Sequence, residues 1–244
     1  MKTIGIGFLL LLMLGLTGCK TYHLSSSWTA QRPRIDGQLN EWDRTSLRSL
    51  NEGAIQVMLT NDSRYLYLAG IITDPSMARF LRMFGLTLWV DTDGGNSKRV
   101  EVRLPAVSAA AFDIDRGGFR ESYTEEQRNR AGEQLDSLRQ GVLVQSNTDQ
   151  QYRVFPRGTG EFRAVVTREQ ETEVRYEMRI PLSFQSDFLS YPSPGRHGTL
   201  GLGFGIPMVR RLEEGSMQPG GMMPRRGSFM ETEEVWSEVT LAQR

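Results

Sequence analysis

Hydrophobic and polar residues alternate over much of this chain, and this alternation predicts β-strands. In residues 54–73, two such runs flank the polar turn Asn61-Asp62-Ser63, which is typical of a β-hairpin. Residues 86–104 repeat the arrangement around an Asp-Gly-Gly-Asn turn. Residues 32–43 read as a tight turn centred on Asp36-Gly37. Further strands are predicted at 142–146, 152–155, 161–167, 173–182, 198–206 and 233–241.

One segment has the period of a helix instead. Its apolar residues recur at i, i+3, i+4 and i+7, and they are Met77, Phe80, Leu81 and Phe84. Asp74 stands at the N-cap position, Pro75 at the first helical position and Gly85 just past the end. We therefore expect a short amphipathic helix with its apolar side chains buried.

A second helix is predicted at 122–140. Ser122 and Glu125 form a capping box, the apolar residues Ala131, Leu135 and Leu138 share one face, and Gly141 ends the pattern. Helices are too few to alternate with the strands as a parallel α/β sheet requires. The sequence therefore predicts an all-β fold, an antiparallel β-sandwich of the jelly-roll or immunoglobulin-like type, with one or two short inserted helices.

The N-terminus has the pattern of a secretory signal peptide over residues 1–18. Lys2 supplies its positive charge, and the apolar run from Ile4 to Leu16 is too short to span a bilayer comfortably. The ending Leu-Thr-Gly-Cys resembles the bacterial lipobox, in which the cysteine sulfur receives a diacylglyceryl group. Cys19 is therefore the expected lipidation site, because a thiolate is the side-chain nucleophile best able to form a thioether.

Lipidation predicts that the protein is located in the cell envelope. Several acyl chains, at about 0.8 kcal/mol per buried methylene, hold a protein firmly on a membrane. Lys20 after the cysteine, rather than Asp, points to the outer membrane, on its periplasmic or surface face. The polar residues 19–31 are expected to form a lipidated tether, with Trp28 inside it, and residues 32–244 to form the domain.

Composition narrows the range of partners. The 244 residues carry 29 basic and 29 acidic side chains, so the protein has no net positive charge that would attract nucleic acid. Nucleic acid is therefore not expected as a partner. Arginine outnumbers lysine by 26 to three, but the arginines are scattered, and a GC-rich genome explains the bias more simply than anion recognition. With a single cysteine, the exported chain forms no internal disulfide and depends on its apolar core.

Several stretches, in this order, resemble a known family. They are the opening IDGQLNEWD at 35–43, RYLYLAGIITDP at 64–75, LWVDTDGG at 88–95, VRYEMRIPLS at 174–183 and the closing EEVWSEVTL at 233–241. Together they resemble the family 9 carbohydrate-binding-module-like sandwiches, close relatives of the DOMON-like group. The resemblance covers nearly the whole mature chain, and it implies a non-catalytic domain that binds an extracellular glycan.

Sugar recognition needs a flat aromatic ring and fixed hydrogen-bonding groups around it. The candidate ligand-binding residues are Trp42, Trp89 and Tyr123, with Tyr191 as a further aromatic. A structural role is favoured for Trp42, which belongs to the opening motif. A core position is favoured for Trp89 and for Trp236, which lie in the middle of strands. The sequence does not place any two tryptophans face to face.

The sequence contains two candidate sites for metal ions. Asp91, Asp93 and Asn96 present oxygen ligands that would suit calcium, whereas the alternative for this segment is an ordinary hairpin turn. Asp74 ends a neighbouring strand and could contribute, although it also serves as a helix cap. The methionines 217, 222, 223 and 230 would suit cuprous ions, and their alternative is a mobile loop.

The remaining alternatives concern the class of protein. Haem carriers among the DOMON-like relatives use axial Met with His or Lys, and this chain offers His23 and His197. Pairs of acidic residues, which glycosidases use for catalysis, occur at 113–119 and 123–127. The sequence contains no nucleophile elbow, P-loop or dinucleotide-binding turn, so we do not predict an enzyme. A glycan-binding lipoprotein is the leading hypothesis. A structural lipoprotein with an envelope protein partner comes second, and a haem or metal carrier third.

Overall fold

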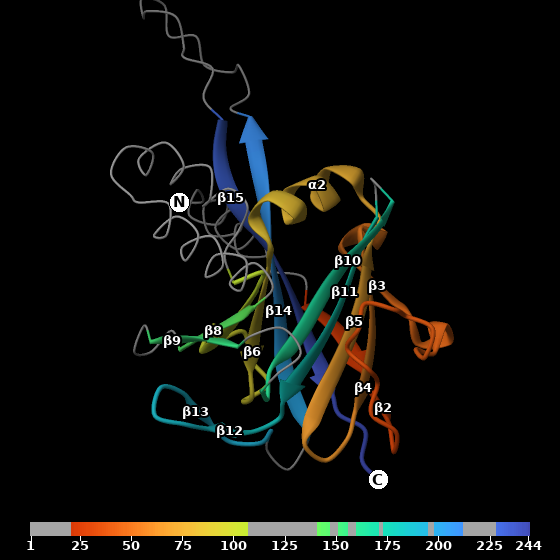
Figure 1. The fold of residues 1–244 in the computed structure, drawn as a ribbon, viewed down its shortest axis with the longest axis vertical. Helices are drawn as coiled ribbons and strands as arrows, with labels where there is room; N and C mark the ends of the chain where they lie inside the picture. The colour runs from red at the N-terminus through yellow and green to blue at the C-terminus, as the bar shows by residue number, and fades with distance from the viewer. Residues whose placement is uncertain are drawn as a thin grey trace, which may run out of the picture.

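The computed structural model describes residues 21–106, 141–146, 151–155, 160–170, 173–194, 198–211 and 228–244. Within these residues, two β-sheets pack face to face, and helix α2 (Pro75–Phe84) covers one end of the sandwich (Figure 1). The predicted β-sandwich with a short inserted helix is confirmed. Within the described residues, no helix is long and apolar enough to cross a membrane.

The larger sheet is antiparallel except at one edge, where β1 runs parallel to β15. The predicted strands after residue 85 are confirmed, and the last two extend beyond their predicted bounds. In lateral order the strands are β1 (Thr21–Ser25), β15 (Ser228–Thr240), β14 (Thr199–Arg211), β6 (Leu86–Asp91), β7 (Val100–Leu104), β8 (Val142–Ser146) and β9 (Tyr152–Phe155).

The smaller sheet contains the predicted hairpin, β4 (Ile55–Asn61) and β5 (Tyr65–Ile72). On one side of it lie β11 (Glu173–Pro181) and the edge strand β10 (Arg163–Gln170). The other side pairs with β3 (Arg48–Leu50) and, in parallel, with β2 (Ser27–Trp28). Separate short elements are β12 (Phe184–Gln185), β13 (Ser190–Tyr191) and the 3-10 turns η2 (Arg44–Ser46) and η3 (Asn51–Gly53).

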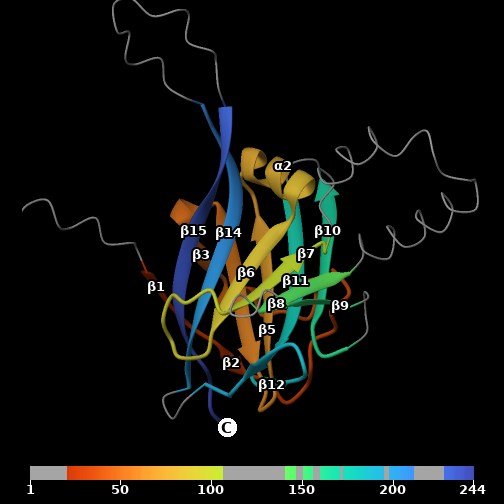
Figure 2. The same cartoon turned by 90° about the vertical axis from the view of Figure 1, so that its left-hand side faces the viewer.

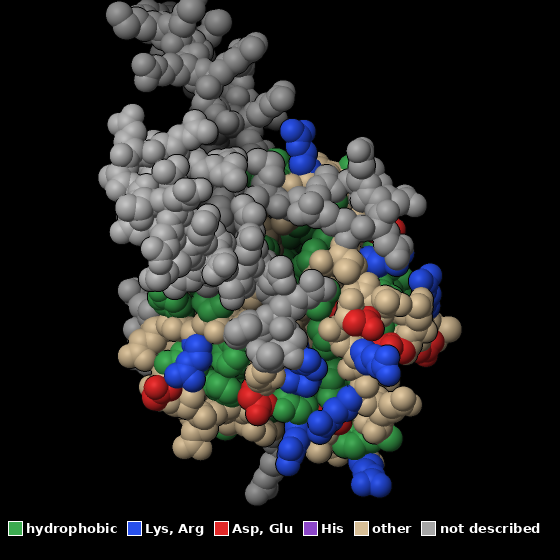
Figure 3. Space-filling view, viewed as in Figure 1, with side chains coloured by type: hydrophobic (Ala, Val, Ile, Leu, Met, Phe, Trp, Pro, Cys, Tyr) green, Lys and Arg blue, Asp and Glu red, His purple; other side chains and the backbone are tan. Residues whose placement is uncertain are grey.

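The main core lies between the two sheets, because alternate residues of each strand point inward. Leu66 and Leu68 of β5 belong to this cluster, as do Leu88 of β6 and Phe204 of β14. In the space-filling view, hydrophobic side chains are visible along the seam between the layers, with basic and acidic side chains interspersed around them (Figure 3).

Helix α2 (Pro75–Phe84) forms where the sequence predicts it. The Asp74 carboxylate caps its first turn by accepting a hydrogen bond from the Met77 N–H at 2.7 Å. Gly85 ends the helix with φ = 84°, a conformation that favours glycine. The helix packs on β14 and β11 and closes one end of the sandwich (Figure 2).

A second apolar cluster lies on the outer face of the smaller sheet. It forms under residues 29–47, a segment that we call the strap, which carries Leu39 and Trp42 onto this face. Beneath the strap, the sheet contributes Met58 from β4 and Tyr65, Tyr67 and Ala69 from β5. The opening motif of the sequence is thus the segment that covers this sheet.

The predicted tether at 19–31 is wrong from residue 21 onward. Thr21–Ser25 pairs with β15 along the edge of one sheet, and Ser27–Trp28 pairs with β4 of the other. Leu24 is buried in the main core. The polar sequence hides these strands because edge strands expose most of their side chains and gain their order from backbone pairing. The sandwich therefore begins within two residues of Cys19.

Candidate functional site

A pair of tryptophans marks the outer face of the larger sheet. Leu88 and Val90 of β6 point into the main core, so Trp89 between them points to the opposite face. On β15, Trp236 lies on that same outer face, since its neighbour Val235 belongs to the core. Both rings are buried, as the sequence favoured, but they lie on the outer face of the larger sheet rather than between the two sheets.

Glycines on β14 allow the two rings to meet. Gly203 pairs with Trp89 on one side and with Trp236 on the other, so the three residues form one row across the sheet. A Cβ at Gly203 would lie 2.8 Å from the Trp236 ring, and one at Gly205 would lie 2.6 Å from the Trp89 ring. Both indoles thus lie over backbone that carries no side chain.

The two indoles stack on each other. Their centroids are 6.0 Å apart and their planes differ by 17°, within the usual range for rings in contact. Trp89 is 6% exposed and Trp236 is 5% exposed. The structure therefore assembles an aromatic pair that the sequence alone did not place together.

Charged groups frame the pair. The Trp89 Nε1–H donates to Glu101 at 3.3 Å, and Glu101 also binds Arg103 at 2.5 Å. The Trp236 Nε1–H donates to Glu234 at 3.3 Å, and Glu234 forms an ion pair with Lys98. Each indole N–H is therefore held by a carboxylate that is itself paired with a cation.

Lys98 connects the two halves of this frame. Its ammonium nitrogen lies 4.5 Å from the centroid of Trp89, in cation–π geometry, while it pairs with Glu234 across the sheet. The side chain is 41% exposed. The cluster therefore combines two largely buried indole rings with hydrogen-bond donors and acceptors, among which the Lys98 ammonium group is partly exposed.

Trp42 has a structural role, as the sequence favoured. It is largely buried in the second cluster, and its Nε1–H donates to Glu177 at 2.7 Å. The fully buried Glu177 carboxylate also accepts the backbone N–H groups of Asp36, at 3.0 Å, and of Gly37. Burial raises the pKa of Glu177, although these hydrogen bonds act in the opposite direction.

The segment predicted as a calcium site is a hydrogen-bonded turn. Asp91 accepts the backbone N–H of Asp93 at 3.0 Å and that of Ser97 at 2.8 Å, and Asp93 pairs with Arg99 at 2.6 Å. Asn96 is exposed. Among the described residues no three His, Cys, Asp or Glu side chains form a metal-binding group. This geometry does not support calcium ligation by Asp91, Asp93 and Asn96, and Asp74 is used as a cap.

The other predicted residues fall into two groups. Tyr191 is buried, and its hydroxyl donates to the Pro181 carbonyl at 2.9 Å, which gives it a structural role. His23 is an exposed residue of the edge strand beside Glu238. The others lie outside the described residues: Cys19, Tyr123 and the helix at 122–140, His197, the acid pairs, and Met217, Met222 and Met223. For Met230, the structure gives only a place in β15.

Trp236, Glu101, Lys98 and Gly203 were missed as site residues. One signal for them exists in the sequence Gly201-Leu-Gly-Phe-Gly205, where glycine takes every second position of a predicted strand. Such a stripe leaves one face of the strand bare, and bulky neighbours can then lie across it. Which rings lie there depends on the register of the two adjacent strands, which the sequence does not show.

The comparisons with known proteins add two structural similarities. One is to a family 9 carbohydrate-binding module from Caldicellulosiruptor kristjanssonii in complex with glucose, with 13% identity, a TM-score of 0.41 and coverage of 91% of this chain and 96% of that chain. The other is to such a module from the same organism in complex with cellotriose, at 13% identity, a TM-score of 0.39 and coverage of 92% and 95%. No family model and no curated protein match the chain. Similarities this weak carry no argument about its ligand.

Proposed function

We propose that this protein is a non-catalytic glycan-binding module, held on the bacterial outer membrane by an acylated Cys19. The observation that carries the proposal is the stacked pair of Trp89 and Trp236 on the outer face of the larger sheet. Aromatic side chains contribute strongly to both protein cores and binding interfaces. Here two largely buried indoles lie outside the cluster between the sheets, each with its N–H directed to a carboxylate.

The chemistry of a sugar fits this arrangement. One face of a pyranose is lined by C–H groups that pack on an indole, and its hydroxyls both donate and accept hydrogen bonds. Glu101 and Glu234 supply acceptors, and Lys98 and Arg103 supply donors. We expect the sugar to displace the Lys98 ammonium from the Trp89 ring, because that side chain is long and partly exposed.

The test uses residues 20–244, which contain every described strand, on an array of plant, algal and peptidoglycan glycans. We expect binding that Lys98→Ala and Glu101→Gln change by several fold and that Trp89→Ala abolishes. Tyr152→Ala removes an aromatic ring that is 65% exposed on the edge strand β9, and serves as the matched control. A folded protein that binds none of these glycans would contradict the proposal.

The anchor requires a separate experiment. In cells, the full chain should sediment with the outer membrane, and Cys19→Ser should release it without loss of the fold, since every described strand lies after Cys19. Recovery of the Cys19→Ser protein in the membrane pellet contradicts lipidation as the means of attachment.

One observation favours a second function, that of an envelope protein that binds another protein. Strands β14 and β15 stay paired from Thr199 opposite Thr240 as far as Arg211 opposite Ser228. The far part of this hairpin projects beyond helix α2 and the rest of the sandwich (Figures 1 and 2). A cross-link in cells between position 229 and another envelope protein, together with no binding on the glycan array, would favour this function over sugar binding.

A further inference from the structure

A cavity lies on the other side of the molecule, between the strap and strand β2. Its volume is about 360 Å³, within the size range of small-molecule sites. Trp28 of β2 and Trp42 of the strap line it, together with Leu59 and Thr60 of β4. Because the strap covers the outer face of the smaller sheet, this cavity is separate from the Trp89–Trp236 pair, which lies on the larger sheet.

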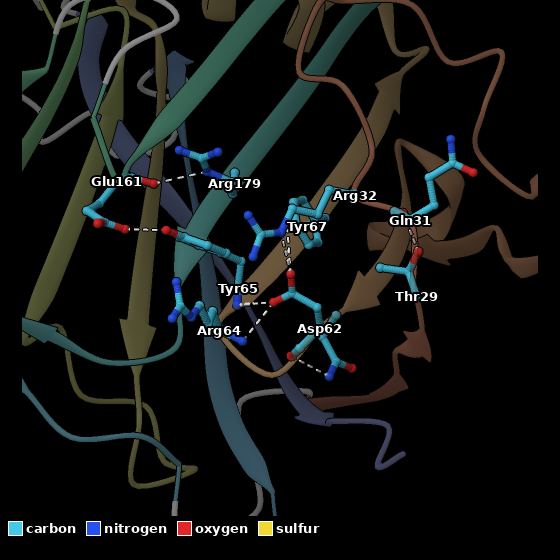
Figure 4. A network of polar contacts seen from close by, with 10 residues as sticks. Thr29, Gln31, Arg32, Asp62, Arg64, Tyr65, Tyr67, Glu161 and Arg179 are labelled. Atoms are coloured by element: carbon cyan, nitrogen blue, oxygen red, sulfur yellow. Dashed lines mark hydrogen bonds and ion pairs between the residues drawn. The ribbon is translucent and has the colours of Figure 1, made fainter.

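One wall of the cavity is fixed by a hydrogen-bonded network. Arg32 lines the cavity and donates from Nε to Asp62 at 2.9 Å (Figure 4). Asp62 also accepts the Tyr67 hydroxyl at 3.0 Å, and the Arg32 guanidinium lies 5.4 Å from the Tyr65 ring centroid. The position of this arginine is therefore set before any ligand arrives, which lowers the entropy cost of binding.

Other groups that line the cavity retain hydrogen-bonding capacity. Among the described residues, the Trp28 indole N–H has no partner, and neither does the Arg34 guanidinium. The Glu41 carboxylate accepts the Arg34 backbone N–H through Oε1 only, and Asp43 uses Oδ1 for the Thr45 N–H and hydroxyl. One oxygen of each carboxylate remains available.

The charges around the cavity select the class of ligand. Arg32, Arg34, Glu41 and Asp43 all line it, so an anion meets two carboxylates and a cation meets two guanidinium groups. A neutral hydroxylated molecule meets no such penalty, because each hydroxyl can donate to a carboxylate and accept from a guanidinium or indole N–H. Trp28 adds an apolar surface for the C–H face of a ring.

We propose that this cavity is a second binding site, for a neutral monosaccharide unit, with Trp28 and Arg34 as contact residues. It extends the proposed function without depending on the tryptophan pair. Two sites on opposite faces would allow one protein to hold two chains or two parts of one glycan, with a gain in avidity.

The test follows the four indole N–H resonances of ¹⁵N-labelled residues 20–244 by NMR, each assigned by a Trp→Phe variant. The probes are glucose, glucuronate and glucosamine, which share one ring and differ in charge. We expect glucose to shift the Trp28 resonance in a saturable manner, and the two charged probes to bind more weakly. Arg34→Gln should weaken glucose binding about tenfold, as loss of a charge-assisted hydrogen bond implies. Arg48→Gln, in strand β3, is the control.

The outcomes separate this site from the first. A Trp28 resonance that no probe moves overturns the second site, whatever happens at Trp89 and Trp236. A stronger response to glucuronate or glucosamine than to glucose overturns the assignment to a neutral sugar. Shifts at Trp28 alone support the cavity while leaving the tryptophan pair without a ligand, so failure of the proposed function and failure of this inference give different spectra.

Discussion

The indole N–H of Trp42 donates to the carboxylate of Glu177 at 2.7 Å, across 135 residues of sequence. Glu177 lies on β11, and Trp42 lies on the strap that covers the same face of the smaller sheet. With the backbone N–H groups of Asp36 and Gly37, this carboxylate accepts three hydrogen bonds, and it holds the strap in place.

Replacing Glu177 by Gln should destabilise the protein. The amide nitrogen must face either the indole N–H or the backbone N–H groups, so at least one donor loses its partner at a cost of about 1–3 kcal/mol. Urea unfolding at pH 7 measures this loss. Glu233→Gln, which changes a partly exposed residue of β15, is the matched control and should have little effect.

The pH dependence of the Glu177 effect has a definite sign. Burial raises the pKa of Glu177 in the folded state above its value in the unfolded state. The stabilisation that Glu177 contributes is therefore complete below the unfolded-state pKa, and it is lost as the pH rises through the folded-state pKa. The difference in unfolding free energy between the wild type and Glu177→Gln should therefore be larger at pH 4.5 than at pH 7. A difference that shrinks on acidification contradicts this assignment.

Asp62 should behave in the opposite way. Burial alone would raise its pKa, but the hydrogen bonds from the Arg64 and Tyr65 backbones, Arg32 and Tyr67 together lower it. A depressed folded-state pKa stabilises the protein above the unfolded pKa, and this is lost as pH falls through the folded pKa. Asp62→Asn should cost roughly 1.5–3 kcal/mol at pH 7 and less at pH 3, measured by urea unfolding.

Gly203→Ala tests the close packing of the tryptophan pair against strand β14. The new methyl group would lie 2.8 Å from the Trp236 ring, so the ring must shift, at a cost of roughly 1–3 kcal/mol. We expect loss of the circular-dichroism band from coupled indoles together with lower stability. Combining Gly203→Ala with Trp236→Leu should cost less than the sum of the single changes, because the smaller side chain relieves the clash. Full additivity would contradict the contact.

Leu24→Ala tests the membership of β1 in the sandwich. Leu24 is buried in the main core, and its truncation should cost roughly 2–5 kcal/mol, measured by thermal and urea unfolding. His23→Ala, one residue away and exposed, should cost little. If residues 21–25 were part of a tether, the two variants would be equally stable.

The local elements of this fold could be predicted because each depends on short-range pattern. The hairpin at β4 and β5 follows from alternation around a polar turn, and α2 follows from Asp74, Pro75 and Gly85. Strands β1 and β2 could not be predicted, since their order comes from backbone pairing with β15 and β4 rather than from an apolar pattern.

By itself, the sequence determined the all-β class and the caps and turns, because these depend on neighbours along the chain. Tertiary structure decided which residues meet across the sheets. Alternation shows that Trp89 and Leu88 face opposite ways, yet it does not show that β15 lies two strands away and brings Trp236 onto the same glycine. The buried Glu177 and the cavity beside Trp28 depend likewise on packing between segments far apart in the chain, and only the assembled sandwich makes those contacts.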